Sequence, residues 1–160
     1  LLLGVGVHPR ALDAGALSAL PHRMEPVLSS GDVLWVNDSK ATNVGATVAA
    51  IEGMASSGPL VVIAGGDGKS ADFSALRDSF NEALRGVILI GRDADKIEAV
   101  VGQRCACQRA TDMRSAVELA ESIARHGDVV LLSPACASHD MYENYEQRGE
   151  DFRRLVLEIR

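Results

Sequence analysis

The segment LVVIAGGDGKS (Leu60–Ser70) joins an unbroken apolar run to a glycine-rich polar loop. An apolar run of this kind is typical of a strand that is buried on both faces, as in a parallel sheet covered by helices. Two further runs, Val87–Ile90 and Val129–Leu132, have the same character. The sequence therefore predicts that these three segments are central strands of one parallel sheet.

Segments with a helical spacing of apolar residues lie between and beyond these runs. The expected helices are residues 44–54, a helix capped by Asp72 that carries Phe73, Leu76 and Phe80, a short helix from Asp93, a helix from Asp112 that ends at Gly127, and a last one with Phe152, Leu155, Val156 and Ile159. Residues 104–108 are a candidate short strand. Alternating strands and helices predict a doubly wound α/β domain with a mostly parallel sheet that is covered on both faces.

A hairpin is predicted upstream of these elements. The turn-forming residues Ser29–Asp32 lie between the apolar segments Val27–Leu28 and Val33–Val36. Two short apolar segments that flank a glycine-containing turn indicate a β-hairpin. We therefore expect one antiparallel edge strand in the otherwise parallel sheet.

The composition is that of one globular domain of 160 residues, 47% hydrophobic and 24% charged. A formal net charge of -6 and a pI near 5.2 argue against nucleic-acid binding. No apolar stretch approaches the roughly 20 residues that cross a membrane. The three cysteines, Cys105, Cys107 and Cys136, form no disulfide framework, which favours free structural thiols in a reducing, cytoplasmic compartment.

Polar loops follow three of the predicted strands, at residues 37–43, 65–72 and 133–138. The carboxyl ends of parallel strands meet at one edge of the sheet, where helix N-termini also point, so these loops should converge. They are rich in lysine, hydroxyl groups and glycine. This chemistry suits an anionic ligand, because lysine supplies charge while hydroxyls and exposed backbone N–H groups donate hydrogen bonds.

Each of these loops also has a plainer interpretation. The loop that carries Lys69 does not fit the Walker pattern, which would require a glycine at Ile63, and it can be a simple strand-to-helix turn. Asp38 and Lys40 can form a surface ion pair, and Ser138 can be only a helix N-cap.

Three motifs together resemble the D-glutamate-adding ligases of the Mur ligase family. They are VNDSKATN (Val36–Asn43), GGDGKSADF (Gly65–Phe73) and LSPACAS (Leu132–Ser138). The flanking segments Pro21–Arg23 and Asn144–Gly149 are similar to the same ligases, and the match runs in order from about Pro21 to the C-terminus. The sister ligases of this pathway carry different loops at these positions.

The resemblance implies the C-terminal, Rossmann-like domain of a three-domain enzyme of peptidoglycan synthesis. Residues 1–20 would be the end of the central ATPase domain and a linker, and residues 21–160 the C-terminal domain. The implied partners are ATP with Mg²⁺, D-glutamate, UDP-N-acetylmuramoyl-L-alanine and the N-terminal and central domains, in a monomeric cytoplasmic protein. The Mg²⁺ ligands would lie outside this chain, which alone is expected to be inactive.

The resemblance also implies roles for individual residues. Those expected to bind D-glutamate are Thr42, Lys69, Ser138 and Tyr145, the last at a position where the family often has phenylalanine. Those expected to reach ATP are Arg23 and Lys40, near the phosphates, and Asp38, near the ribose. The local chemistry fits, because a dicarboxylate needs cationic and hydroxyl donors whereas a ribose diol suits a carboxylate acceptor.

Two alternatives stay open from the sequence. One is the C-terminal domain of a folylpolyglutamate synthase, which also ligates glutamate but carries different loops at these positions. The other is a non-catalytic module that binds an anion or a nucleotide. A reading frame that continues upstream into a Walker loop would favour the ligase, and a natural start at Leu1 would favour the module.

Overall fold

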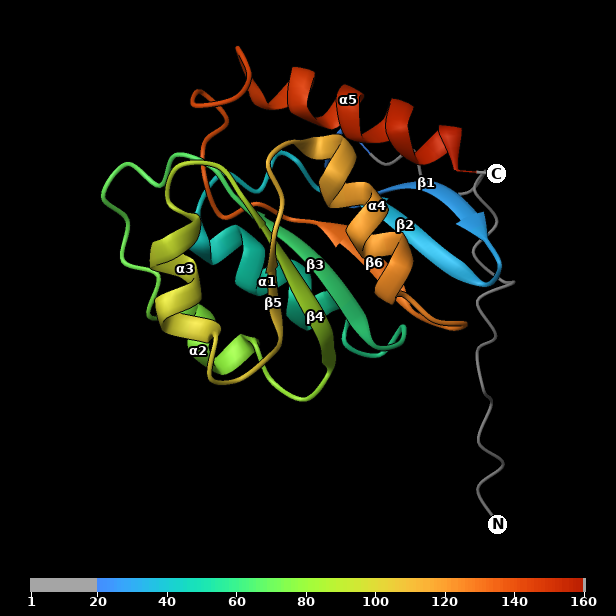
Figure 1. Cartoon of the computed structure of the whole chain (residues 1–160), viewed down its shortest axis with the longest axis horizontal. Helices are drawn as coiled ribbons and strands as arrows, with labels where there is room; N and C mark the ends of the chain where they lie inside the picture. The colour runs from blue at the N-terminus through green and yellow to red at the C-terminus, as the bar shows by residue number, and fades with distance from the viewer. Residues whose placement is uncertain (1–19, 160) are drawn as a thin grey trace.

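The computed structural model describes residues 20–159, so the linker expected at residues 1–20 lies outside the described residues except for Leu20. The elements in chain order are β1 (Glu25–Ser30), β2 (Val33–Asn37), α1 (Val44–Met54), β3 (Leu60–Gly65), α2 (Leu76–Ser79), β4 (Leu84–Ile90), α3 (Ala94–Val101), β5 (Cys107–Arg109), α4 (Met113–Ile123), β6 (Val129–Leu132) and α5 (Tyr145–Glu158). Figure 1 shows a single sheet with helices packed around it and α5 lying along its upper side.

The six strands form one sheet in the order β1-β2-β6-β3-β4-β5. All neighbours pair in parallel except β1 and β2, which form the antiparallel hairpin predicted at the edge. The last strand of the chain, β6, lies between β2 and β3. The connection from β2 through α1 to β3 therefore passes over β6, and the loops after β2, β6 and β3 leave the sheet side by side.

The central strands are buried on both faces, as their apolar runs predict. In β3, Val62 and Ala64 belong to the core cluster that includes side chains of α1, α2 and α3, whereas Val61 and Ile63 belong to the cluster with α4 and α5. None of these four side chains is exposed. Helices thus cover the two faces separately, and the doubly wound α/β class is confirmed.

Polar side chains cap the N-termini of α4 and α5, the two helices that pack against Val61 and Ile63 of β3. The Asp112 carboxylate accepts the Ser115 N–H (2.8 Å) in a reciprocal capping box at α4, which confirms the predicted start. The Asn144 side chain accepts the Gln147 N–H (2.7 Å) at the start of α5. This second cap sets where α5 begins, immediately after the loop that contains Ser138.

The helix predicted after Asp72 is wrong in its extent. Asp72 caps no helix but accepts the Ser74 N–H (2.9 Å) in a local turn, and α2 is a single helical turn. The three apolar residues of the expected stripe are nevertheless buried. Their spacing predicted burial correctly, but the local side-chain hydrogen bond of Asp72 replaces the first turn of the expected helix.

Two other boundaries differ from the prediction. The strand expected at residues 104–108 is β5, which begins only at Cys107. Cys105 therefore lies before the strand and not within it. Helix α4 ends at Ile123 because Ala124 has an extended backbone, and Gly127, with φ 86°, belongs to the following turn.

The three cysteines are free thiols, as predicted. Burial raises the pKa of Cys105 and of Cys136 to about 12, which makes both thiols unreactive near neutral pH. None of the helices within residues 20–159 is both long enough and apolar enough to cross a membrane.

Candidate functional site

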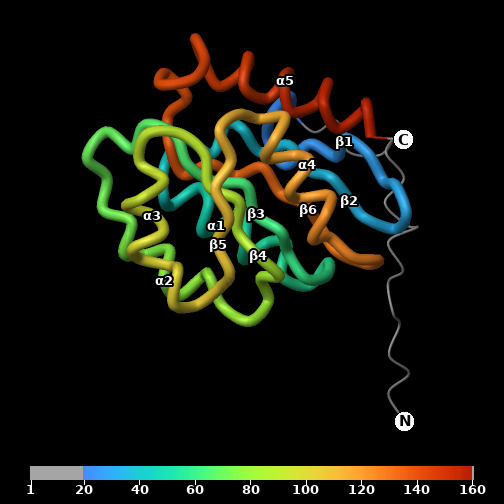
Figure 2. The backbone as a smooth tube through the Cα atoms, in the orientation of Figure 1, coloured from blue at the N-terminus to red at the C-terminus, as the bar shows by residue number. Residues whose placement is uncertain are grey.

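Three loops meet at the carboxyl ends of β2, β3 and β6. The loop after β6 joins the loop after β3 through reciprocal backbone hydrogen bonds between Asp67 and Ala137, both 2.9 Å long. It also joins the loop after β2, because the Ala135 N–H donates to the Ala41 carbonyl (3.0 Å). Figure 2 shows the green loop after β3 and the orange loop after β6 at the same end of the sheet. The predicted convergence of the loops is confirmed.

Three of the residues predicted to bind D-glutamate lie on these loops. Each is within two positions of a residue that forms one of the inter-loop backbone hydrogen bonds. Thr42 directly follows Ala41 and is partly buried, and Ser138 directly follows Ala137 and is 2% exposed. Lys69 comes two residues after Asp67 and is exposed. The fold thus brings the backbone of all three to one rim, while their roles toward a ligand stay predictions.

A pocket of about 360 Å³ lies between the residues before β1, the loop after β2 and helix α1. Its lining residues are Arg23, Met24, Asp38, Lys40, Ala41, Ala46, Ala49, Ala50 and Gly53. The structure therefore brings together all three residues predicted to reach a nucleotide. The alanines of α1 supply an apolar wall beside these charged groups.

Asp38 is a buried acid at the edge of this pocket, with 5% of its surface exposed. One carboxylate oxygen accepts the Met24 N–H (3.2 Å) and the other accepts the Ser133 hydroxyl (3.0 Å). Burial raises the pKa of Asp38, against the lowering effects of these two bonds and of Arg23. Within residues 20–159 no ion pair joins Asp38 to Lys40, so the plain surface-pair interpretation is wrong.

Asp38→Asn should increase the free energy of unfolding near pH 7. The amide keeps an oxygen for the Met24 N–H and donates to the Ser133 hydroxyl, without burying a charge. Because the pKa of Asp38 is raised in the folded state, the parent protein gains stability as the pH falls through that pKa. The difference in the free energy of unfolding between variant and parent should therefore shrink at low pH. Urea unfolding at about pH 7 and about pH 4 measures both effects. A variant less stable than the parent at pH 7 would contradict the prediction.

Tyr145, the first residue of α5, lies beside Lys40, one of the residues predicted to reach ATP. Its carbonyl accepts the Ser39 hydroxyl (2.8 Å), and its ring lies 5.8 Å from the Lys40 ammonium, within the range of a cation–π contact. The ring also makes an edge-on contact with the His22 ring. Tyr145 therefore stands next to Lys40, and its predicted contact with D-glutamate stays a prediction.

Arg148 is a buried residue of the site to which the sequence interpretation gave no role. It is 1% exposed and joins α5 to two loops: its guanidinium donates to the Ser39 hydroxyl (2.9 Å), the Ser39 carbonyl (2.8 Å) and the Cys136 carbonyl (3.1 Å). Burial lowers the pKa of Arg148 to about 10. A signal was present, because Arg148 precedes Phe152 by four residues and so shares the buried face of α5.

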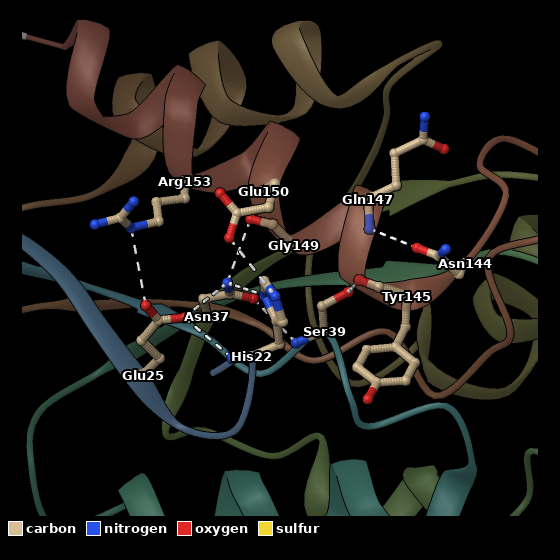
Figure 3. A network of polar contacts seen from close by, with 10 residues as sticks. All are labelled: His22, Glu25, Asn37, Ser39, Asn144, Tyr145, Gln147, Gly149, Glu150 and Arg153. Atoms are coloured by element: carbon tan, nitrogen blue, oxygen red, sulfur yellow. Dashed lines mark hydrogen bonds and ion pairs between the residues drawn. The ribbon is translucent and has the colours of Figure 1, made fainter. Parts of the chain in front are cut away.

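A second polar network attaches α5 to the start of the domain (Figure 3). The side-chain nitrogen of Asn37 lies 3.0 Å from His22 Nδ1, 3.2 Å from the Glu25 carboxylate and 3.3 Å from the Gly149 carbonyl. His22 Nε2 lies 3.6 Å from the Glu150 carboxylate. A β-carbon on Gly149 would lie 2.2 Å from His22 Nδ1, so α5 approaches this closely only because residue 149 is glycine.

Metal ligands do not gather at this rim. In the part of the chain that the structure describes, no group of three or more His, Cys, Asp or Glu side chains is placed to hold a metal ion. The pocket is lined by the cations Arg23 and Lys40 and by one carboxylate, Asp38.

Comparisons with known proteins match most of the chain. A family model described as Mur ligase, glutamate ligase domain, matches residues 22–136. A UDP-N-acetylmuramoylalanine--D-glutamate ligase of Marinobacter nauticus is 51% identical over 154 residues, which are 96% of this chain and 34% of that protein. The ligase of the same name from Nitrosococcus oceani is 51% identical over 99% of this chain and 36% of its own length. The chain spans about a third of the length of these curated relatives.

Solved structures share the fold. The MurF ligase from Thermotoga maritima in complex with ADP has a TM-score of 0.64 and 20% identity, covering 89% of this chain and 33% of that one. A bifunctional folylpolyglutamate synthase/dihydrofolate synthase from Yersinia pestis also has a TM-score of 0.64, with 17% identity over 88% of this chain and 32% of that one. At these identities the likeness shows the fold alone, and the fold does not separate the two kinds of enzyme.

Proposed function

The chain belongs to the Mur ligase family, and from this premise we propose that it is the C-terminal domain of an ATP-dependent ligase that adds D-glutamate to UDP-N-acetylmuramoyl-L-alanine. The observation that carries the proposal is the joining of three polar loops at one rim, beside a pocket lined by Arg23, Asp38 and Lys40. The names of relatives that are about half identical to this chain support D-glutamate as the amino-acid substrate.

The proposed D-glutamate site consists of Thr42, Lys69, Ser138 and Tyr145. A dicarboxylate needs a cation and hydroxyl donors, and the first three residues provide them. The charge of Lys69 is available for this purpose, because Asp67, two residues earlier, is paired with Arg92. An exposed ammonium group at the end of a buried strand can therefore meet a ligand carboxylate.

The proposed nucleotide site is the pocket beside α1. Its volume of about 360 Å³ lies within the range of about 300–1,000 Å³ that is usual for ligand pockets. In this proposal the pocket contacts only one side of the nucleotide. Arg23 and Lys40 would neutralise phosphate groups, and the alanine wall would contact the apolar part of the nucleotide. Each carboxylate oxygen has two lone pairs, so Asp38 can accept ribose hydroxyls while it keeps its bonds to Met24 and Ser133.

The proposed reaction has two steps. ATP phosphorylates the carboxylate of UDP-N-acetylmuramoyl-L-alanine, which gives an acyl phosphate and ADP, and the amine of D-glutamate then attacks the activated carbonyl and expels phosphate. The residues of this chain hold and orient the amine donor and exclude water from the acyl phosphate. The Mg²⁺ ligands and the phosphate-binding loop are proposed to lie in the central domain, so this chain alone should be inactive. We further propose a monomeric, cytoplasmic enzyme.

The alternatives are less well supported. Three folylpolyglutamate synthase structures share the fold at 16–17% identity, whereas a D-glutamate ligase is 51% identical over 96% of this chain. The same identity makes a non-catalytic module less well supported, although such a module would fold in the same way.

Lys69→Ala in the full-length enzyme should raise the KM for D-glutamate by roughly 10- to 150-fold. A hydrogen bond to a charged group contributes about 1.5–3 kcal/mol, and every 1.4 kcal/mol corresponds to a factor of about ten. The KM for ATP should stay near that of the parent, because the nucleotide pocket does not include Lys69. Steady-state phosphate release, with each substrate varied in turn, measures both constants.

A matched control is Arg104→Ala. Arg104 is also an exposed cation, but it precedes β5 and so lies toward the opposite ends of the strands. Its removal should leave both KM values unchanged. An unchanged KM for D-glutamate in the Lys69→Ala enzyme would remove Lys69 from the site, and an enzyme that accepts no D-glutamate would overturn the proposed function.

A further inference from the structure

The turn between β4 and α3 contacts both loops that carry the proposed D-glutamate ligands. It consists of Gly91, Arg92 and Asp93, and the sequence pattern predicts only that a short helix begins at Asp93. The Asp93 side chain forms no cap hydrogen bond with α3. Its carboxylate is instead directed to the loop after β3, although Asp93 lies more than twenty residues further along the chain.

Asp93 holds the backbone that leads to Lys69. Its N–H donates to the Gly66 carbonyl (2.9 Å), and one carboxylate oxygen accepts the Gly68 N–H (2.7 Å). The other oxygen pairs with Lys96 (2.6 Å), which together with the Gly68 bond keeps the pKa of Asp93 below its usual range. Asp93 is 5% exposed and Gly68 is buried, so water cannot readily replace this acceptor.

Arg92 joins the same turn to the other loop. Its N–H donates to the Asp140 carboxylate (2.8 Å), and its guanidinium pairs with Asp67 (3.3 Å). Asp140 comes two residues after Ser138, and Asp67 comes two residues before Lys69. The turn after β4 therefore links the two loops independently of the direct backbone bridge between them.

The backbone at Lys69 needs such support. Lys69 and Ser70 have φ values of 48° and 64°, in the left-handed region that non-glycine residues rarely adopt. Two such residues in succession persist only where the surrounding structure holds them. The bonds that do so are Lys69 N–H to Asp67 (3.0 Å) on the exposed side and Gly68 N–H to Asp93 on the buried side.

We propose that Asp93 is a positioning residue for D-glutamate: by holding Gly66 and Gly68, it directs the Lys69 ammonium toward the ligand carboxylate. The inference rests on the proposed function, which assigns Lys69 to that carboxylate. Asp93 acts through the backbone and does not touch the ligand. It is separate from the nucleotide pocket, whose lining residues do not include it.

The test uses the full-length enzyme with three substitutions. Asp93→Ala should raise the KM for D-glutamate about tenfold, because a small misplacement of a substrate-binding group has a large kinetic effect, while the KM for ATP stays unchanged. Asp93→Asn keeps an oxygen for the Gly68 N–H and should restore the KM for D-glutamate to within about twofold of the parent. Lys96→Ala removes only the exposed partner of Asp93 and should behave like the parent.

The outcomes separate this inference from the function on which it rests. If Lys69→Ala raises the KM for D-glutamate but Asp93→Ala does not, Asp93 has no positioning role and the proposed function stands. If neither changes it, the proposed D-glutamate site itself is wrong. If Asp93→Ala raises the KM for ATP as much as the KM for D-glutamate, the substitution causes a general structural defect, and the inference is overturned. Should Asp93→Ala fail to fold, Asp93→Glu carries the test. Its longer side chain must displace Gly68, so the KM for D-glutamate should again rise.

Discussion

Gly66→Ala should destabilise the domain by about 4 kcal/mol and abolish the site with it. Gly66 has φ 135°, a conformation that side chains rarely adopt, and a β-carbon there would lie 2.4 Å from the Ala137 carbonyl oxygen. Backbone strain of about 1–3 kcal/mol adds to an overpacking cost of about 1–3 kcal/mol. The contact cannot relax without separating the loop that carries Lys69 from the loop that carries Ser138, because Asp67 and Ala137 hold them together. Urea unfolding measures the loss of stability.

Gly127→Ala is the matched control for this prediction. Gly127 also has a positive φ, 86°, but no atom lies within 4 Å of an added β-carbon. Only the conformational cost remains there, about 1–2 kcal/mol. A Gly66→Ala protein no less stable than the Gly127→Ala protein would show that the Ala137 carbonyl leaves room for a β-carbon at residue 66.

Arg148→Ala should destabilise the domain by about 3–5 kcal/mol. The substitution removes three hydrogen bonds, leaves the buried carbonyls of Ser39 and Cys136 without their donor, and opens a cavity under the site. Because Ser39 lies between Asp38 and Lys40, and Cys136 lies two residues before Ser138, both proposed half-sites should lose affinity together. Thermal unfolding reports the stability, and in the full-length enzyme the KM values for ATP and D-glutamate should both rise.

Arg154→Ala provides the comparison on the same helix. Arg154 is exposed and pairs with Asp151 and Glu158 on the surface of α5. Surface pairs of this kind contribute about 1 kcal/mol or less, so stability and both KM values should stay near those of the parent. If Arg148→Ala is as mild as Arg154→Ala, Arg148 does not hold the loops together.

Local patterns predicted most of the elements and the convergence of the polar loops. The run Leu60–Ala64 indicated a strand buried on both faces, and β3 is such a strand. The glycine-rich and hydroxyl-rich loops were placed at the carboxyl ends of strands, and they meet there. The pattern failed at Asp72, because apolar spacing reports which residues are buried but not whether the backbone between them is helical. The Asp72 side chain bonded locally, and one helical turn was enough to bury the same residues.

The hydrogen-bond partners of the residues that hold the loops in place could not be predicted from local patterns. Asp93 bonds to Gly68 across 25 positions, and Arg148 bonds to Ser39 across 109. An aspartate at the start of a helix is an expected cap, and an arginine is ordinarily expected on the exposed face of an amphipathic helix, even though the spacing from Phe152 puts Arg148 on the buried face. Both expectations are reasonable for an isolated segment. Each is wrong here because another segment supplies the partner.

The amino-acid sequence by itself determined the alternation of strands and helices, the two-sided burial of the central strands and the polar chemistry of the loops that follow them. These properties depend on side chains within a few positions of one another, so the pattern of residues contains them. Only the tertiary structure decided that β6 lies between β2 and β3, and with it which loops touch. Strand order depends on pairing between segments about 95 residues apart, such as Trp35 with Val130. The buried strands all have similar apolar sequences, so the local pattern does not show which of them are neighbours.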